Sequence, residues 1–172
     1  MQTLVVSKIK LYQEARKKDI LGKDHYKMNG PHAVAALGRH FLRGDVKESL
    51  LAVAVNTKNE VIAVYTVFTG TINSIVVSPR EIMQFALLNN ASSLALIHNH
   101  PSGTSEPSSE DVIFTNRVQM AGDLLDVELL DHVVITDDDH SSIRSMNPEL
   151  FERKTNKELE AFVADERGGY DE

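Results

Sequence analysis

The sequence contains no cysteine, and this absence excludes several kinds of site at once. Without thiols the chain can form neither disulfides nor the closed, cysteine-rich zinc sites that stabilise many small domains. Zinc deaminases, which bind their metal through a Pro-Cys-x-x-Cys pair, are excluded for the same reason. Because a chain without cysteine is compatible with a reducing compartment, we expect a cytoplasmic protein.

Long apolar runs and an excess of positive charge are also missing. No apolar run is long enough to cross a bilayer, and Met1-Gln2-Thr3-Leu4 does not begin a basic-then-apolar signal peptide, so we expect no membrane contact. The net charge of −7 has the wrong sign for broad nucleic-acid binding, which needs many Lys and Arg side chains to displace phosphate counterions. Nucleic acid is therefore not expected as a direct ligand.

The composition is that of a globular protein. Hydrophobic residues make up 42% and charged residues 25% of the 172 residues, which suits one domain with a sizeable core and leaves too little chain for two full domains. We expect an N-terminal strand and helix extension over residues 1–45, a central domain over 46–146 and a charged, helical C-terminal tail over 147–172.

Capping residues and apolar periodicity predict three helices before the tail. The first begins at Pro31 and ends before Gly44-Asp45, because proline suits the first helical position. The second begins after Ser78, which forms a capping-box pattern with Glu81. The third begins at Ser108, and Gly122 is the weak point inside it.

Strands are predicted between these helices. We expect a short strand within residues 3–12, a hairpin over 50–68, a fully buried strand at 94–97, a strand at 127–135 and a last short strand beginning at Ile143. Strands that alternate with helices indicate an α/β or α+β fold, with a mixed central sheet flanked by helices.

The segment that carries chemistry is Ile97-His98-Asn99-His100, at the end of the buried strand. Side chains alternate along a strand, so His98 and His100 point to the same face. Asp111 lies at the start of the next helix, from which its carboxylate can turn back towards the two imidazoles. Three protein ligands leave one coordination position open, which in zinc proteins is typical of a catalytic site.

The order His-x-His, seven residues, Ser, two residues, Asp is complete as His98, His100, Ser108 and Asp111. This spacing is that of the JAMM, or MPN-plus, metalloprotease motif. The surrounding segments also resemble the RadC family of bacterial JAB-domain proteins, over roughly residues 46–146: Ser78-Pro79-Arg80-Glu81, His98-Asn99-His100-Pro101-Ser102-Gly103, Pro107-Ser108 and Leu130-Asp131-His132. The resemblance implies a JAB/MPN-like fold, a Zn²⁺ cofactor bound by His98, His100 and Asp111, and a peptide or protein substrate.

The resemblance also implies roles for two further residues. JAMM proteins place a glutamate before an apolar strand upstream of the motif, and Glu48 occupies such a position before Leu50, so we expect it to be the general base. Four other glutamates compete for that role: Glu60, Glu81, Glu106 and Glu110. Ser108 is expected to donate a hydrogen bond to the tetrahedral oxyanion. The expected activity is hydrolysis of a peptide or isopeptide bond.

Each of these assignments has a structural competitor. Ser108 and Asp111 lie three residues apart at a helix start, where a capping role alone would explain them, although both roles can hold together. Asp131-His132 is expected to be a structural hydrogen-bonded pair rather than a ligand pair. The alternative function is that of a DNA-repair-associated accessory or binding protein whose metal site serves stability or another activity. A DNA-binding protein would lose affinity steeply as the salt concentration rises.

Overall fold

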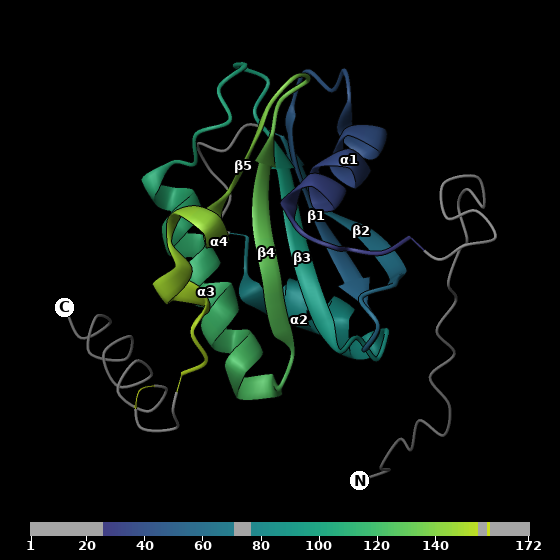
Figure 1. Cartoon of the computed structure of the whole chain (residues 1–172), viewed down its shortest axis with the longest axis vertical. Helices are drawn as coiled ribbons and strands as arrows, with labels where there is room; N and C mark the ends of the chain where they lie inside the picture. The colour runs from purple at the N-terminus through teal and green to yellow at the C-terminus, as the bar shows by residue number, and fades with distance from the viewer. Residues whose placement is uncertain (1–25, 71–76, 155–157, 159–172) are drawn as a thin grey trace, which may run out of the picture.

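A computed structural model of the chain describes residues 26–70, 77–154 and 158. Within this part, five strands form one sheet in the order β2-β1-β3-β4-β5 (Figure 1). They are β1 (Glu48–Val55), β2 (Val61–Gly70), β3 (Ser93–Asn99), β4 (Glu128–Ile135) and β5 (His140–Ser142). The helices are α1 (Pro31–Leu42), α2 (Pro79–Leu88), α3 (Ser109–Leu125), α4 (Ile143–Met146) and the 3₁₀ turn η2 (Pro148–Phe151).

The sheet is mixed, as predicted. Neighbouring strands are antiparallel except for β3 and β4, which are parallel. A parallel pair needs a long crossover, and α3 supplies it. The expected strand at residues 3–12, and the tail beyond residue 158, lie outside the described residues.

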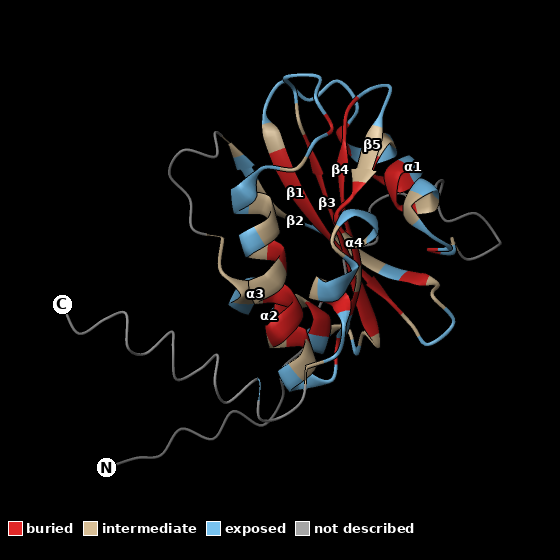
Figure 2. Cartoon of the chain, turned by 60° about the vertical axis from the view of Figure 1, so that its left-hand side comes forward, coloured by how far each residue is buried: buried red, intermediate tan, exposed pale blue. Residues whose placement is uncertain are grey.

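Two hydrophobic layers cover the two faces of the sheet. Helix α1 packs on one face, where its Leu37 joins Ile97 and Val133 in a buried cluster. Helices α2 and α3 cover the other face, where Ile82 and Val118 pack with the remaining strand residues. Figure 2 shows the buried strands β1, β3 and β4 between these layers. Because α1 buries its apolar face on this sheet, it shares the core of residues 46–146.

β3 is buried at every position from Ser93 to Asn99, as its continuous apolar sequence predicts for a strand covered on both faces. The last two residues of this central strand, His98 and Asn99, are still buried. Of the described residues, no helix is both long enough and apolar enough to cross a bilayer.

Two local predictions are corrected by the structure. Ile143 begins the short helix α4 rather than a strand, because Ser142 caps that helix by accepting a hydrogen bond from the backbone of Ser145. Ser78 caps α2 through the backbone N–H of Arg80, without the reciprocal Glu81 interaction of a capping box. Gly122 has a packing reason, since a methyl group there would collide with the Val127 carbonyl oxygen where the chain turns into β4.

Candidate metal centre

Strand register brings Glu48 and the two histidines to one end of the sheet. Leu50 of β1 pairs with His98 of the antiparallel strand β3. Glu48 is two residues before Leu50 and His100 is two residues after His98, so Glu48 lies beside His100. Residues opposite one another across such a pair share a face of the sheet. All of these side chains therefore point to the face that α2 and α3 cover.

The two imidazoles face each other. Their Nε2 atoms lie 2.9 Å apart, and the His98 side chain is buried while that of His100 is partly exposed. The alternation expected from the sequence thus places both rings at the same site.

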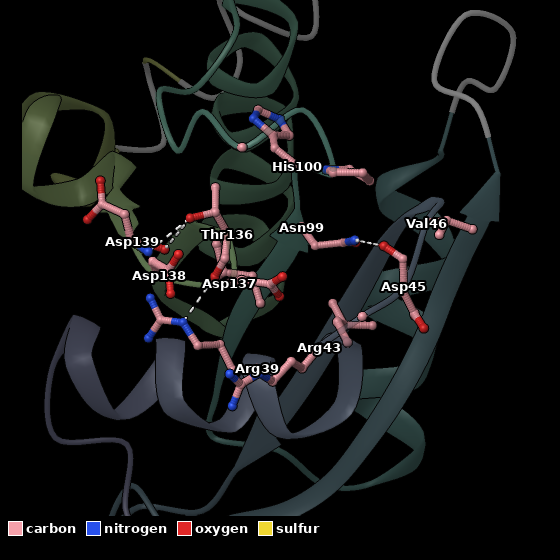
Figure 3. Close-up of a pocket in the computed structure, with 15 residues that line it drawn as sticks. Arg39, Arg43, Asp45, Val46, Asn99, His100, Thr136, Asp137, Asp138 and Asp139 are labelled. Carbon is pink, nitrogen blue, oxygen red and sulfur yellow. Dashed lines mark hydrogen bonds between the residues drawn. The ribbon is translucent and has the colours of Figure 1, made fainter.

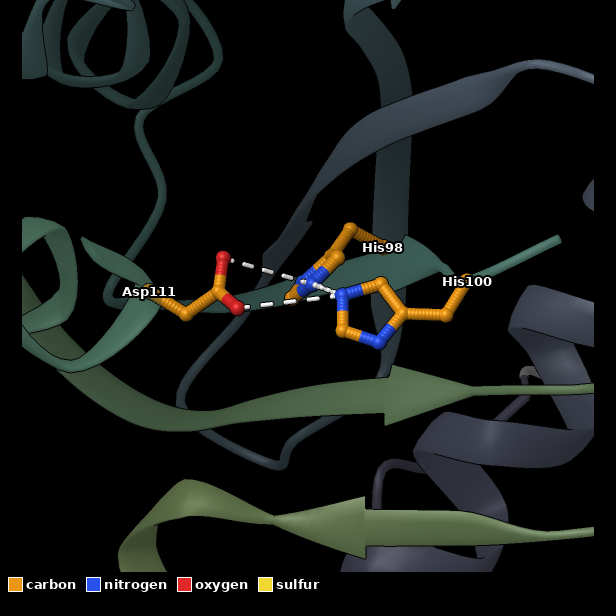
Figure 4. A group of neighbouring side chains, drawn as sticks. All are labelled: His98, His100 and Asp111. Carbon is orange, nitrogen blue, oxygen red and sulfur yellow. Dashed lines mark hydrogen bonds and ion pairs between the residues drawn. The ribbon is translucent and has the colours of Figure 1, made fainter. Parts of the chain in front are cut away.

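Asp111 completes the group from the first turn of α3 (Figure 4). Its Oδ1 lies 3.4 Å from His98 Nε2, and its Oδ2 lies 3.7 Å from His100 Nε2. These three residues are a group whose potential ligand atoms lie within 4.8 Å of one another. The structure therefore brings together the ligand set expected from the sequence.

A capping box orients the Asp111 carboxylate. Ser108 accepts a hydrogen bond from the Asp111 backbone N–H, and Asp111 Oδ2 accepts from both the backbone N–H and the hydroxyl of Ser108, at 2.8 and 2.6 Å. Burial acts to raise the pKa of the Asp111 carboxyl, but hydrogen bonding and charge interaction with His98, with the bonds from Ser108, hold it well below its usual value. The group therefore stays ionised.

A backbone carbonyl fixes the tautomer of His100. Its Nδ1 lies 2.8 Å from the Thr104 carbonyl oxygen, which can only accept a hydrogen bond. The proton of the neutral ring is therefore on Nδ1, and Nε2 presents a lone pair to the site.

A chain of hydrogen bonds fixes His98 in the same way. The Thr115 hydroxyl donates its only proton to the backbone carbonyl oxygen of Asp111 at 2.6 Å. The Thr115 oxygen therefore accepts a hydrogen bond from His132 Nδ1–H, also at 2.6 Å. Burial lowers the pKa of His132 well below its usual value, so this ring is neutral and its Nε2 accepts from His98 Nδ1–H at 2.8 Å. The lone pair of His98 is thereby left on Nε2, which faces His100.

When both imidazoles are neutral, three lone pairs therefore converge at the site. Two unprotonated imidazole nitrogens and an ionised carboxylate repel one another unless a cation, either a proton on one ring or a metal ion, lies between them. Two imidazoles and one carboxylate are also a common ligand set for zinc in catalytic sites. The residues present therefore fit a divalent metal ion with one or more coordination positions left for other ligands.

Glu48 is the glutamate that reaches this group. Its Oε1 lies 3.7 Å from His100 Nε2, and its side chain is partly exposed. Of the competing glutamates, Glu60 accepts a hydrogen bond from Asn56 in the β1–β2 turn, Glu81 lies in the first turn of α2, and Glu106 and Glu110 are exposed. Among the described residues, neither Glu106 nor Glu110 forms an ion pair with an imidazole of the site.

The positioning roles of His132 and Asn99 were not identified from the sequence. Asp131 and His132 form the expected hydrogen-bonded pair, since Asp131 Oδ1 accepts from the His132 backbone N–H, but the His132 ring also accepts the hydrogen bond from His98 Nδ1–H. Asn99 points to the opposite face, where it accepts a bond from the Ser49 backbone at 2.8 Å and donates to the Lys47 carbonyl at 3.0 Å. These bonds clamp the chain on both sides of Glu48. The alternation of side chains along β3 is the only sequence signal for this role of Asn99.

The Thr115 hydroxyl offers a test of the hydrogen-bond chain. We expect Thr115→Val, which preserves the shape of the side chain, to lower the affinity for Zn²⁺ by about 10- to 100-fold, because His132 loses the acceptor that fixes its tautomer. The unsatisfied buried donor should also cost about 1–3 kcal/mol of stability. Chelator competition and chemical unfolding measure the two effects. Thr115→Ser keeps the hydroxyl and should retain the affinity; a low affinity in both variants would contradict this role.

The sequence is similar to that of a known protein family. A family model described as the RadC-like JAB domain matches residues 28–148. A UPF0758 protein of Desulforamulus reducens is 43% identical over 115 residues, covering 67% of this chain and 51% of that protein. One from Clostridium kluyveri is 45% identical over 112 residues, covering 65% and 49%. One from Bacillus licheniformis is 43% identical over 126 residues, covering 71% and 54%. The chain spans about half the length of these curated relatives.

Proposed function

The chain belongs to the RadC-like JAB domain family, and from this membership and the site geometry we propose that it is a zinc-dependent hydrolase of peptide or isopeptide bonds. The observation that carries the proposal is the convergence of His98, His100 and Asp111, with both imidazole tautomers fixed by hydrogen bonds to residues behind them. Glu48, which we assign as the general base, lies beside them, with its Oε1 3.7 Å from His100 Nε2. A purely structural metal site would not need this further carboxylate.

The metal would be held by His98 Nε2, His100 Nε2 and the Asp111 carboxylate. Bound there, zinc supplies Lewis acidity, which lowers the pKa of water towards about 7 and polarises a substrate carbonyl. The protein residues supply orientation and proton transfer. His132 and Thr104 hold the two imidazoles, and Ser108 holds the carboxylate.

Glu48 is placed to accept a proton from the attacking water and to deliver it to the leaving amine. Its carboxylate lies at the open side of the imidazole pair, and the Asn99 clamp fixes the start of β1 that carries it. A positioned carboxylate of this kind contributes about 10²- to 10⁴-fold to the rate.

A direct experiment follows from the proposal. Protein loaded with Zn²⁺ is incubated with a mixture of peptides and isopeptide-linked conjugates, and new termini are identified by mass spectrometry. Cleavage should disappear after the metal is removed by a chelator and return when Zn²⁺ is restored. Cleavage that continues unchanged in the chelated protein would overturn the proposal.

Ser108 has an observed capping role and a proposed catalytic one. Its hydroxyl proton is directed to Asp111 in this structure, so stabilising an oxyanion would require that proton to turn towards the substrate. We expect Ser108→Ala to cost about 1 kcal/mol of stability and to reduce turnover by about 100-fold. Ser108→Gly separates the roles, because glycine caps helices almost as well but has no hydroxyl. Turnover should stay low in Ser108→Gly; its recovery together with stability would leave capping as the only role.

A further inference from the structure

A cavity of about 340 Å³ adjoins the candidate metal centre on one side. Two residues of the centre, His98 and Asp111, line this cavity together with the neighbouring Glu48. A molecule whose carbonyl group approaches the centre from this side therefore places the chemical group next to that carbonyl in the cavity. The volume lies within the range of small-molecule binding sites.

The rest of the lining is largely apolar. Leu50 and Phe68 contribute from β1 and β2, and Ile113 and Phe114 contribute from α3. Phe114 lies three residues after Asp111 and so falls on nearly the same side of the helix. Ile113 is 61% exposed, so its side chain is accessible to a ligand in the cavity.

Charges at this cavity oppose an anionic ligand group. Glu110 and Arg117 line it with one charge of each sign, and Glu48 belongs to the proposed catalytic group. A carboxylate entering from a substrate would meet Glu48 and Asp111, whereas an apolar group would meet five apolar side chains. The cavity therefore favours an apolar group over an anionic one.

The other side of the centre has a different character. A cavity of about 600 Å³ lies beyond His100, and its lining includes Arg39, Arg43, Asp45 and residues 137–139 (Figure 3). Asn99 lines this second cavity while His98 lines the first, because the two side chains point to opposite faces of β3. The end of β3 thus separates an apolar cavity from one with more charged side chains in its lining.

We propose that the apolar cavity is the subsite for a large aliphatic or aromatic side chain of the substrate, next to the bond that is cleaved. This inference rests on the proposed function and names the substrate class: peptide segments with a leucine- or phenylalanine-like residue beside the scissile bond. Each buried methylene group should raise the affinity by about fourfold. Acidic residues are selected against at this position.

The probes are hydroxamates, which bind zinc through a common head group and differ in the attached chain. Protein loaded with Zn²⁺ is titrated by calorimetry with acetohydroxamate, 4-methylpentanohydroxamate and glutaric monohydroxamate. The branched apolar probe should bind at least about tenfold more tightly than acetohydroxamate. The acidic probe, of similar length, should bind no more tightly than acetohydroxamate.

Two variants on the same helix locate the effect. Ile113→Asn should remove most of the gain shown by the branched probe while leaving the affinity for acetohydroxamate unchanged. Leu124→Asn is the matched control, since Leu124 is 64% exposed on α3 and lies outside the cavity. This variant should keep the full gain.

The outcomes distinguish the two proposals. Equal affinities of the branched and methyl probes, with binding that still requires zinc, would overturn the subsite and leave the proposed function standing. A gain that survives in Ile113→Asn would also overturn it. Failure of every hydroxamate to bind the zinc-treated protein would overturn the proposed function itself, and the subsite with it.

Discussion

His98→Ala is expected to lower the affinity for Zn²⁺ by more than about a hundredfold. Loss of a residue that only orients a metal ligand lowers the metal affinity by about 10- to 100-fold, so loss of a ligand itself should lower it further. In this site His98 supplies one of the three converging lone pairs, and its removal also leaves His132 Nε2 without its donor. Competition with a chromophoric chelator measures the affinity.

The control must separate loss of a ligand from loss of the fold. His98 is buried, so the variant should also lose some stability, which chemical unfolding of the metal-free protein measures. Asp111→Asn is the conservative partner, because an amide oxygen can still accept the Ser108 hydrogen bonds of the capping box while the charge is gone. Its affinity should fall as well. Retention of wild-type affinity in both variants would show that the ligand set is wrong.

Glu48→Gln is expected to keep the metal and lose hydrolysis. The amide has the size of the carboxylate but cannot accept a proton from water, so turnover should fall by about 10²- to 10⁴-fold. The Zn²⁺ affinity should stay close to that of the wild type, since Glu48 lies outside the ligand group. Single-turnover cleavage of a peptide identified by the mass-spectrometric screen measures the first effect, and chelator competition measures the second.

Glu110→Gln is the matched control for Glu48. Glu110 lines the same apolar cavity and is exposed, but it does not approach the imidazoles as Glu48 does. Its variant should hydrolyse peptides at nearly the wild-type rate. The opposite pattern, with Glu110→Gln inactive and Glu48→Gln active, would reassign the base and leave the metal site unaffected.

The capping box links folding to the ligand geometry. A helix that begins at Ser108 needs acceptors for its free N–H groups, and Asp111 satisfies one of them with the same carboxylate that faces the histidines. The orientation of this ligand is therefore set when α3 forms. From the sequence, capping and metal binding compete as explanations of Ser108 and Asp111. In the structure the two roles are compatible.

Local signals predicted the parts of the site that lie close together in sequence. The apolar run before His98 indicated a buried strand, and the alternation along it indicated that His100 shares its face. Ser108 marked the start of α3 because capping is a short-range interaction. These features depend on a few neighbouring residues, so sequence alone was sufficient.

Long-range contacts could not be predicted in this way. The bond from His98 to His132 requires the parallel register of β3 and β4, and the Thr115 hydroxyl meets His132 only after α3 has packed on the sheet. The packing reason for Gly122 is hidden from the sequence in the same way, since its constraint is the Val127 carbonyl oxygen beyond the end of the helix. In each case the deciding partner is set by tertiary packing.

The most direct test of the metal centre is an anomalous diffraction map at the zinc absorption edge. Crystals are grown from protein incubated with one equivalent of Zn²⁺, and the map locates the ion without reference to activity. One peak is expected, bounded by His98 Nε2, His100 Nε2 and the Asp111 carboxylate, with Glu48 beside it. A map with no peak there, or with zinc bound only at another site, would show that these residues are not the metal ligands.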